Sequence, residues 1–205
     1  MFHSAGKSLH AFSGYKLPSI SAMVLCLALF YARPMSAQVV ATYDFEDGTT
    51  QGWGPFNTPT APVNTTAAAE SGTHSLLATT NSSGGSSGPS IPLTSLLPGA
   101  TYSITGFVML TSGEAATNAN FSMVRHDSSC SGGTCYDTIG GYKVPVSDSG
   151  WAQIGGSYVV STTETSLALY AQLVGPTTQQ TFYLDNVVIT ETAPPPGGTP
   201  VASYN

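Results

Sequence analysis

The acidic side chains are the groups of this sequence most able to catalyse a reaction. Hydrolysis of a glycosidic bond, for example, usually needs two carboxylates that face each other ~5–10 Å apart. Glu46 and Asp47 are adjacent and would point to opposite faces of a strand, which leaves Asp44 and Glu46 as the pair spaced for one face. The remaining glutamates stand alone in turn-like contexts. The carboxylates therefore predict no catalytic pair.

Nucleophilic and metal-assisted catalysis find equally little support in the sequence. Neither His74 nor His126 has a partner at the spacing of a catalytic triad or a metal site. We therefore predict that this chain is not an enzyme.

A ligand-binding surface is better supported, by residues 166–174. The apolar residues at positions 167, 169, 171 and 173 share one face of a strand, and Tyr170 and Gln172 share the other face. A flat ring and an amide on one face suit a sugar, because the C–H groups of a sugar stack on aromatic rings and its hydroxyls need hydrogen-bonding groups. The alternative is that Tyr170 packs beneath a loop.

The elements that must position these residues are short strands. Runs rich in β-branched and aromatic residues alternate with Gly, Ser, Thr and Asn, and no segment has apolar residues at helical spacing. We predict an all-β fold, a two-sheet β-sandwich, although the number of strands does not separate a jelly roll from an immunoglobulin-like sandwich. The predicted strands are residues 39–44, 61–68, 73–79, 88–94, 101–111, 119–126, 135–144, 152–161, 166–174 and 181–191.

The composition excludes several classes of protein. Charged residues make up only 8% of the chain, against about 25% in an average soluble domain, which argues against a helix bundle or a coiled coil. The five basic residues are too few to form the basic face of a nucleic-acid or anionic-membrane binder. An acidic chain of this kind suits a neutral partner such as a polysaccharide.

The N-terminal residues 1–37 have the pattern of a signal peptide. Two lysines precede the uncharged run Ile20–Ala32, and small residues follow at Ser36-Ala37. The run is shorter than the ~20 residues needed to cross a bilayer, so a membrane anchor is the weaker interpretation. We expect a secreted, extracellular protein whose domain, residues 38–191, has no membrane contact once the signal is removed.

Two cysteines remain after the predicted signal is removed. Cys130 and Cys135 are separated by Ser-Gly-Gly-Thr, and an exported protein can oxidise such a pair to a disulfide. Free thiols, or half of a zinc site, are the alternatives, and no second pair is present to complete a zinc site.

The C-terminal end of the chain suggests a tandem arrangement. Residues 192–200 are rich in Pro and Gly and are typical of an extended linker. Residues 201–205, Val-Ala-Ser-Tyr-Asn, repeat the pattern Val-Ala-Thr-Tyr-Asp of residues 40–44. We predict that a second, truncated module begins at residue 201.

Residues 44–53, Asp-Phe-Glu-Asp-Gly-Thr-Thr-Gln-Gly-Trp, resemble the opening motif of the family 22 carbohydrate-binding modules, part of the wider family 4/9/22 group. Shorter matches follow in order at residues 70–76, 88–93, 136–139, 150–151 and 183–187. The resemblance implies a jelly roll whose concave cleft binds β-1,4-xylan, and often mixed-linkage β-glucan. It also implies a non-catalytic module that targets a covalently attached xylanase domain to plant cell wall.

The resemblance also assigns a binding set, which this sequence keeps only in part. The two tyrosines of the family map to Tyr136 and Tyr170, and the family glutamate maps to Gln172. The family arginine maps near Phe56, whose ring is a replacement platform, and the family tryptophan maps to Ser86. Two rival functions follow: a structural module that has lost sugar binding, and a small jelly-roll glycosidase.

A structural calcium ion away from the cleft is the last expectation that the resemblance carries. Glu46 and Asp185 occupy the positions of the carboxylate ligands, with carbonyl groups near Ser71–His74 and the side chain of Asp44 as further ligands. Hard oxygen ligands from distant segments suit Ca²⁺ and would tie the first strand to the last.

Overall fold

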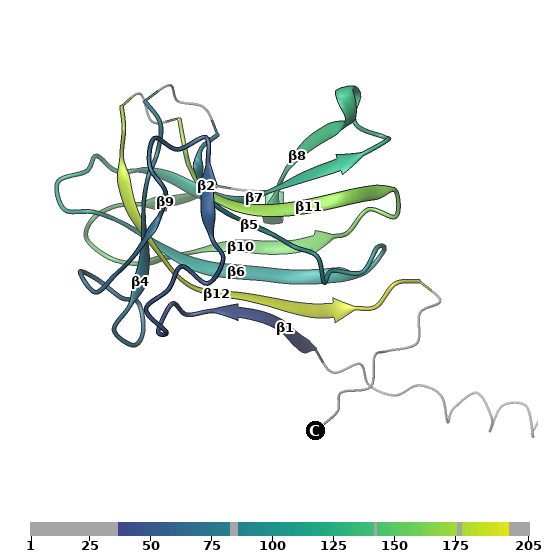
Figure 1. Cartoon of the computed structure of the whole chain (residues 1–205), viewed down its shortest axis with the longest axis horizontal. Helices are drawn as coiled ribbons and strands as arrows, with labels where there is room; N and C mark the ends of the chain where they lie inside the picture. The colour runs from purple at the N-terminus through teal and green to yellow at the C-terminus, as the bar shows by residue number, and fades with distance from the viewer. Residues whose placement is uncertain (1–36, 83–85, 142, 176–177, 197–205) are drawn as a thin grey trace, which may run out of the picture. The chain divides into compact units, whose positions relative to one another are not determined.

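The computed structural model describes residues 37–82, 86–141, 143–175 and 178–196 (Figure 1). The predicted signal peptide, apart from residue 37, and the predicted start of a second module at residues 201–205 lie outside the described residues. Of the predicted linker, residues 192 and 193 belong to the last strand. No helix among the described residues is long and apolar enough to span a membrane.

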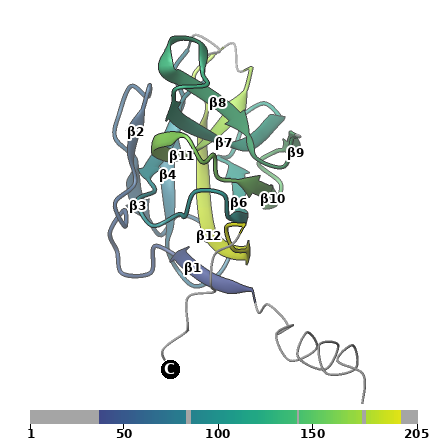
Figure 2. The same ribbon diagram turned by 90° about the vertical axis from the view of Figure 1, so that its right-hand side faces the viewer.

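Two antiparallel sheets, each with six strands, form the domain. Figure 1 shows one sheet above the other, and Figure 2 shows β2 and β9 at opposite edges. Sheet A has the order β10-β6-β12-β4-β3, with β1 paired to β12: β1 Gln38–Tyr43, β3 Val63–Thr65, β4 Ser75–Thr79, β6 Thr101–Leu110, β10 Ala152–Val159 and β12 Thr181–Ala193. Sheet B has the order β2-β5-β11-β7-β8, with β9 paired to β7: β2 Gly54–Phe56, β5 Gly88–Pro92, β7 Thr117–Asp127, β8 Thr134–Thr138, β9 Val144–Val146 and β11 Glu164–Val174. The predicted all-β sandwich is confirmed.

Two details of the strand prediction are wrong. The run 135–144 is two strands rather than one, because Gly140 and Gly141 have φ values of 68° and 72°, a backbone region that glycine enters without steric cost. The short turn η2, Ile139–Gly141, separates β8 from β9 at this point. The strand β2 was not predicted at all, since its three residues include Pro55 and are too short to show alternation.

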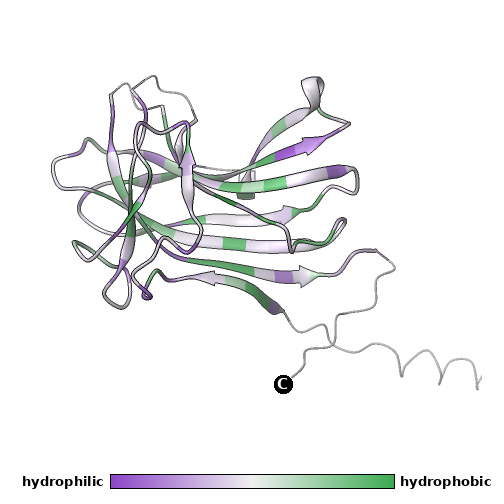
Figure 3. Cartoon of the chain, in the orientation of Figure 1, coloured by the Kyte–Doolittle hydropathy of each residue, from purple (hydrophilic) through white to green (hydrophobic). Residues whose placement is uncertain are grey.

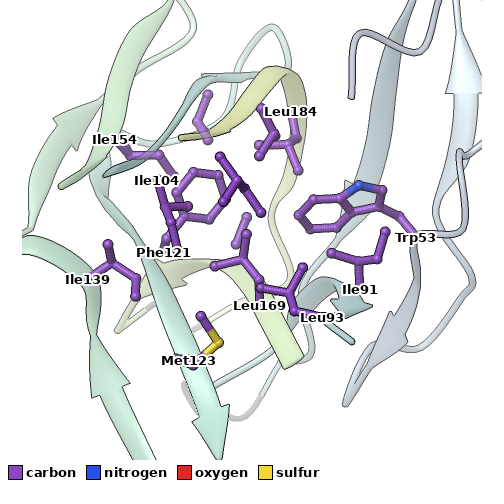
Figure 4. Close-up of a cluster of buried hydrophobic side chains, with 14 of the residues drawn as sticks. Trp53, Ile91, Leu93, Ile104, Phe121, Met123, Ile139, Ile154, Leu169 and Leu184 are labelled. Atoms are coloured by element: carbon purple, nitrogen blue, oxygen red, sulfur yellow. The ribbon is translucent and has the colours of Figure 1, made fainter. Parts of the chain in front are cut away.

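The core lies between the two sheets and follows from the alternation of apolar and polar residues along the strands. Figure 3 shows short apolar segments alternating with polar ones, and Figure 4 shows side chains from both sheets meeting in the core. In β6, every second residue from Tyr102 to Leu110 is buried, and the residues that alternate with them are partly exposed. Trp53 is also buried in this core, so it is a packing residue.

A cluster of charged and hydroxyl side chains links the two sheets near the hairpin of β7 and β8. Arg125 on β7 contacts Asp127 through Nη1 and Asp137 on β8 through Nε, both at 2.6 Å. The hydroxyl groups of Ser161 and Thr163, which follow β10, donate hydrogen bonds to Asp127 and hold the pKa of its carboxyl below its usual value. These contacts connect β7 and β8 of sheet B to the chain that leaves sheet A, beside the hairpin that carries Tyr136.

Candidate functional site

The side chains predicted to bind a ligand lie on the outer face of sheet B, the face turned away from the core. On β11, residues 167, 169, 171 and 173 belong to the core, so Tyr170 and Gln172 point the other way. Phe56 on β2 lies opposite Gly88 on β5, and Tyr136 on β8 lies opposite Val124 on β7. The sheet therefore brings all four predicted residues to one face.

Three aromatic rings gather on this face. The ring centroids of Phe56 and Tyr170 are 4.6 Å apart at an interplanar angle of 38°. The centroids of Phe56 and Tyr136 are 6.5 Å apart at 50°. Phe56 is thus the central ring, in contact with the two tyrosines that the sequence placed in the site.

The predicted role of Tyr170 as an open stacking platform is wrong. Only 1% of Tyr170 is exposed, because the ring of Phe56 packs on it. The alternative, that Tyr170 packs beneath a loop, is closer to the arrangement observed, although the cover is the short strand β2. Alternation along a strand shows which face a side chain occupies, but the segment that covers that face comes from β2, which is distant in sequence.

Tyr136 is the open ring of the group. It is 59% exposed, while Phe56 is partly exposed. The disulfide between Cys130 and Cys135 is confirmed, with the two sulfurs bonded at 1.99 Å. It closes the turn between β7 and β8 directly beside Tyr136 and so limits the motion of the hairpin that presents the ring.

Gln172 takes part in a hydrogen-bond network that sequence reasoning missed. Its Nε2 donates to Oδ1 of Asn120 at 3.3 Å and to Oγ of Ser122 at 3.0 Å. Asn120 and Ser122 lie on β7, where they face outward between the core residues Ala119, Phe121 and Met123. Alternation along 117–127 was the signal that could have placed them, but their contact with Gln172 depends on the register of β7 and β11.

The two carboxylates predicted to bind calcium reach the same loop, between β3 and β4, from different parts of the chain. Oε1 of Glu46 accepts hydrogen bonds from the backbone N–H groups of Thr73 and His74 at 2.9 and 2.7 Å. Oδ2 of Asp185 accepts one from the N–H of Glu70 at 2.7 Å. The segment after β1 and the strand β12 are therefore joined through this loop.

The donor set at this loop fits calcium only with backbone carbonyls as the other ligands. The side chains of Glu46 and Asp185 supply hard oxygen atoms of the kind that Ca²⁺ prefers. Within the ranges that the structure describes, no group of three or more His, Cys, Asp or Glu side chains could hold a metal ion. Burial raises the pKa of the Asp185 carboxyl, and the N–H groups of His74 and Thr73 lower that of Glu46.

Comparison with known proteins gives consistent matches over most of the sandwich. Residues 37–179 match the family described as carbohydrate binding domain. The endo-1,4-beta-xylanase A of Thermoanaerobacterium saccharolyticum is 31% identical over 176 residues, which is 84% of this chain. The exoglucanase XynX of Acetivibrio thermocellus is 30% identical over 167 residues, which is 80% of this chain. The chain spans only 15% of the length of each of these relatives.

Solved structures with the same fold include domains described as binding xylan. The CBM22-1 xylan-binding domain of Xyn10C from Paenibacillus barcinonensis superposes with a TM-score of 0.70 at 27% identity, covering 79% of this chain and 99% of that domain. A further structure, described as a xylan-binding domain from family 22, has a TM-score of 0.65 at 21% identity, and the alignment covers 75% of this chain and 95% of that domain. At this identity the likeness supports only the fold.

Proposed function

The chain belongs to the family of carbohydrate binding domains and is a jelly-roll module of its family 22 branch, and we propose that the outer face of its sheet B binds β-1,4-xylan. Mixed-linkage β-glucan is the second ligand that we propose. In this role, the ring of Tyr136 stacks on the C–H face of one sugar unit and Phe56 contacts the next. Gln172 hydrogen-bonds a sugar hydroxyl, and the module itself performs no chemical step.

One observation carries the proposal. Tyr136 is an aromatic ring with 59% of its surface exposed, and it lies on the same face as a half-buried amide, Gln172. An exposed aromatic side chain on the same face as a hydrogen-bonding group matches the two needs of a neutral sugar chain.

The place of the module in a longer protein is also part of the proposal. The relatives with 31% and 30% identity are named as a xylanase and an exoglucanase, and the matched region is 15% of each. Because the matched region is a small part of each relative, we propose that this module is covalently attached to a glycoside hydrolase and carries it to plant cell wall polysaccharide. Secretion through the predicted signal peptide at residues 1–37 belongs to the same proposal.

Titration of the domain with xylohexaose, beside the variant Tyr136→Ala, tests the binding site. We expect the variant to bind roughly 5- to 10-fold more weakly, which corresponds to about 1 kcal/mol for one aromatic contact. Tyr183→Ala is the matched control, because Tyr183 is a tyrosine of sheet A whose ring contacts Trp151. Unchanged affinity in Tyr136→Ala would refute the site.

Two other outcomes separate the rival functions. A wild-type domain that is not retarded in a gel containing xylan would favour a structural module without sugar binding. Release of reducing sugar from xylan by the chain alone would favour a glycosidase.

We further propose that Glu46 and Asp185 hold a structural Ca²⁺ ion, with carbonyl groups of Ser71–His74 as further ligands. Both carboxylates already contact the same loop, and the carboxyl of Asp185 is fully buried. A bound cation would supply positive charge next to a buried carboxylate, which is costly to leave without charge compensation.

Removal of calcium with a chelator is expected to lower the Tm. Calcium at about 100 times its dissociation constant adds about 2.7 kcal/mol of stability, which corresponds to roughly 5–10 °C for a domain of this size. Calorimetry with chelator, and again after calcium is restored, measures the change. The Tm of the variant Glu46→Gln should no longer rise when calcium is added. The affinity of this variant for xylohexaose, measured at low temperature, should equal that of the wild type. A Tm that does not move on chelation contradicts the site.

A further inference from the structure

On the outer face of sheet B, the side chains of Gln172, Asn120 and Ser122 form a hydrogen-bond network. The backbone carbonyl of Phe121 fixes which atoms of this network donate and which accept. Nδ2 of Asn120 donates to the backbone carbonyl of Phe121 at 2.9 Å and to Oγ of Ser122 at 2.8 Å. A carbonyl oxygen can only accept, so the amide of Asn120 must present Nδ2 to it. Both hydrogens of Nδ2 are used by these two bonds.

The orientation of Asn120 then decides the orientation of Gln172. With Nδ2 held by the carbonyl, Oδ1 of Asn120 faces Gln172 and can only accept a hydrogen bond. Nε2 of Gln172 fills that role at 3.3 Å and also donates to Oγ of Ser122 at 3.0 Å. The other atom of the amide, Oε1, accepts no hydrogen bond within the described residues.

Burial makes this arrangement rigid. Asn120 is 1% exposed and Ser122 is 2% exposed, so an unpaired polar atom in either of them would be costly. Gln172 is half-buried, on the same outer face as the aromatic rings. Its two amide hydrogens are directed at the protein, and its oxygen is the atom left for a ligand.

We propose that Asn120 is a positioning residue that fixes the amide of Gln172 with Oε1 toward the ligand, so that the site requires a hydroxyl donor on a neutral sugar at this position. The inference rests on the proposed function, because it assigns a role to Gln172 within that binding face. Asn120 itself does not contact the ligand and acts through Gln172.

The same geometry explains why an amide suits position 172 in this chain, although the family resemblance places a glutamate there. A carboxylate at this position would bring an acceptor against Oδ1 of Asn120. Asn120 could accommodate it only by turning its own oxygen toward the carbonyl of Phe121. Either contact pairs two acceptors, so Asn120 and Gln172 form a matched pair.

A double-mutant cycle measures this coupling in the ligand affinity. We expect Asn120→Ala and Gln172→Ala each to weaken binding of xylohexaose roughly 5- to 10-fold, since one hydrogen bond is worth about 1 kcal/mol. The double variant should bind about as weakly as Gln172→Ala alone. Additive losses in the cycle would overturn the positioning role.

The variant Gln172→Glu provides a readout that a merely structural role would not produce. Gly88, Asn120 and Ser122, which face residue 172 from β5 and β7, carry no charge. The contact with Oδ1 of Asn120 should therefore raise the pKa of the new carboxyl. We expect weak binding at pH 7 and recovery as the pH falls through that raised pKa, because a protonated carboxyl can donate to Oδ1. Wild-type affinity that is equally pH-dependent, or a variant without pH dependence, contradicts the proposal.

A measurement without ligand separates this inference from the proposed function. In the free protein, the side-chain amide protons of Gln172 should exchange slowly by NMR, and Asn120→Ala should make them exchange roughly 10-fold faster or more. If they do not change, the positioning role is wrong even when xylohexaose binds. If they change but the wild type does not bind xylohexaose, the proposed function fails and the positioning of Gln172 stands. Should Asn120→Ala not fold, Ser122→Ala removes the other acceptor of Nε2 and serves in its place.

Discussion

A double variant carrying Phe56→Ala and Tyr136→Ala is expected to lose most of its affinity for xylohexaose while keeping its fold. Of the three rings in contact on the outer face of sheet B, these two retain exposed surface, whereas Tyr170 is buried. If each ring contributes about 1–2 kcal/mol through stacking and burial, the pair contributes about 2–4 kcal/mol, and the affinity should fall roughly 30-fold or more. Isothermal titration measures the affinity, and the Tm of the variant shows whether the sandwich is intact.

The single variant Phe56→Ala decides which ring the ligand contacts beside Tyr136. Phe56 packs on Tyr170 with centroids 4.6 Å apart, so its removal uncovers the tyrosine. If Phe56 is a platform, the single variant binds more weakly than the wild type. If the single variant binds more tightly, Phe56 is only a cover, and the role predicted for Tyr170 from the sequence would be restored. That result would contradict the assignment made here to Phe56.

The sequence was sufficient to predict the faces of the long strands. In β11 the alternation of leucines with Tyr170 and Gln172 assigned each side chain to the core or to the outer face, and the structure agrees. The pairing of Cys130 with Cys135 was also predictable, because the short spacing and the expected export favour a local disulfide. These properties depend on residues that are near one another in the chain.

The contacts between distant strands could not be predicted in the same way. The cover on Tyr170 comes from Phe56, in a three-residue strand without a recognisable pattern. The contact between Asn120 and Gln172 requires the register that places them opposite each other on β7 and β11. A shift of one residue would move every side chain of a strand to the other face, so no property of either segment alone fixes this pair.

Phe121→Ala is expected to cause the largest loss of stability among single substitutions in the site-bearing strand. Phe121 on β7 of sheet B is fully buried and reaches the backbone of sheet A. A Cβ atom built on Gly106 of β6 would lie 2.9 Å from Cζ of Phe121, so the ring fills the space that the missing side chain of the glycine leaves. Truncation of such a ring removes buried apolar surface and leaves a cavity, at a cost of about 3–5 kcal/mol.

This cost is a large part of the ~5–15 kcal/mol that stabilises a typical domain, and it corresponds to a decrease in Tm of roughly 6–20 °C. Thermal or urea unfolding measures the change, and Val159→Ala, at an exposed valine of β10, is the control expected to unfold like the wild type. Because β7 carries Phe121 toward the core and Asn120 toward the binding face, the variant should still bind xylohexaose well below its Tm. A change in Tm of less than ~2 °C would show that the ring does not hold the two sheets together.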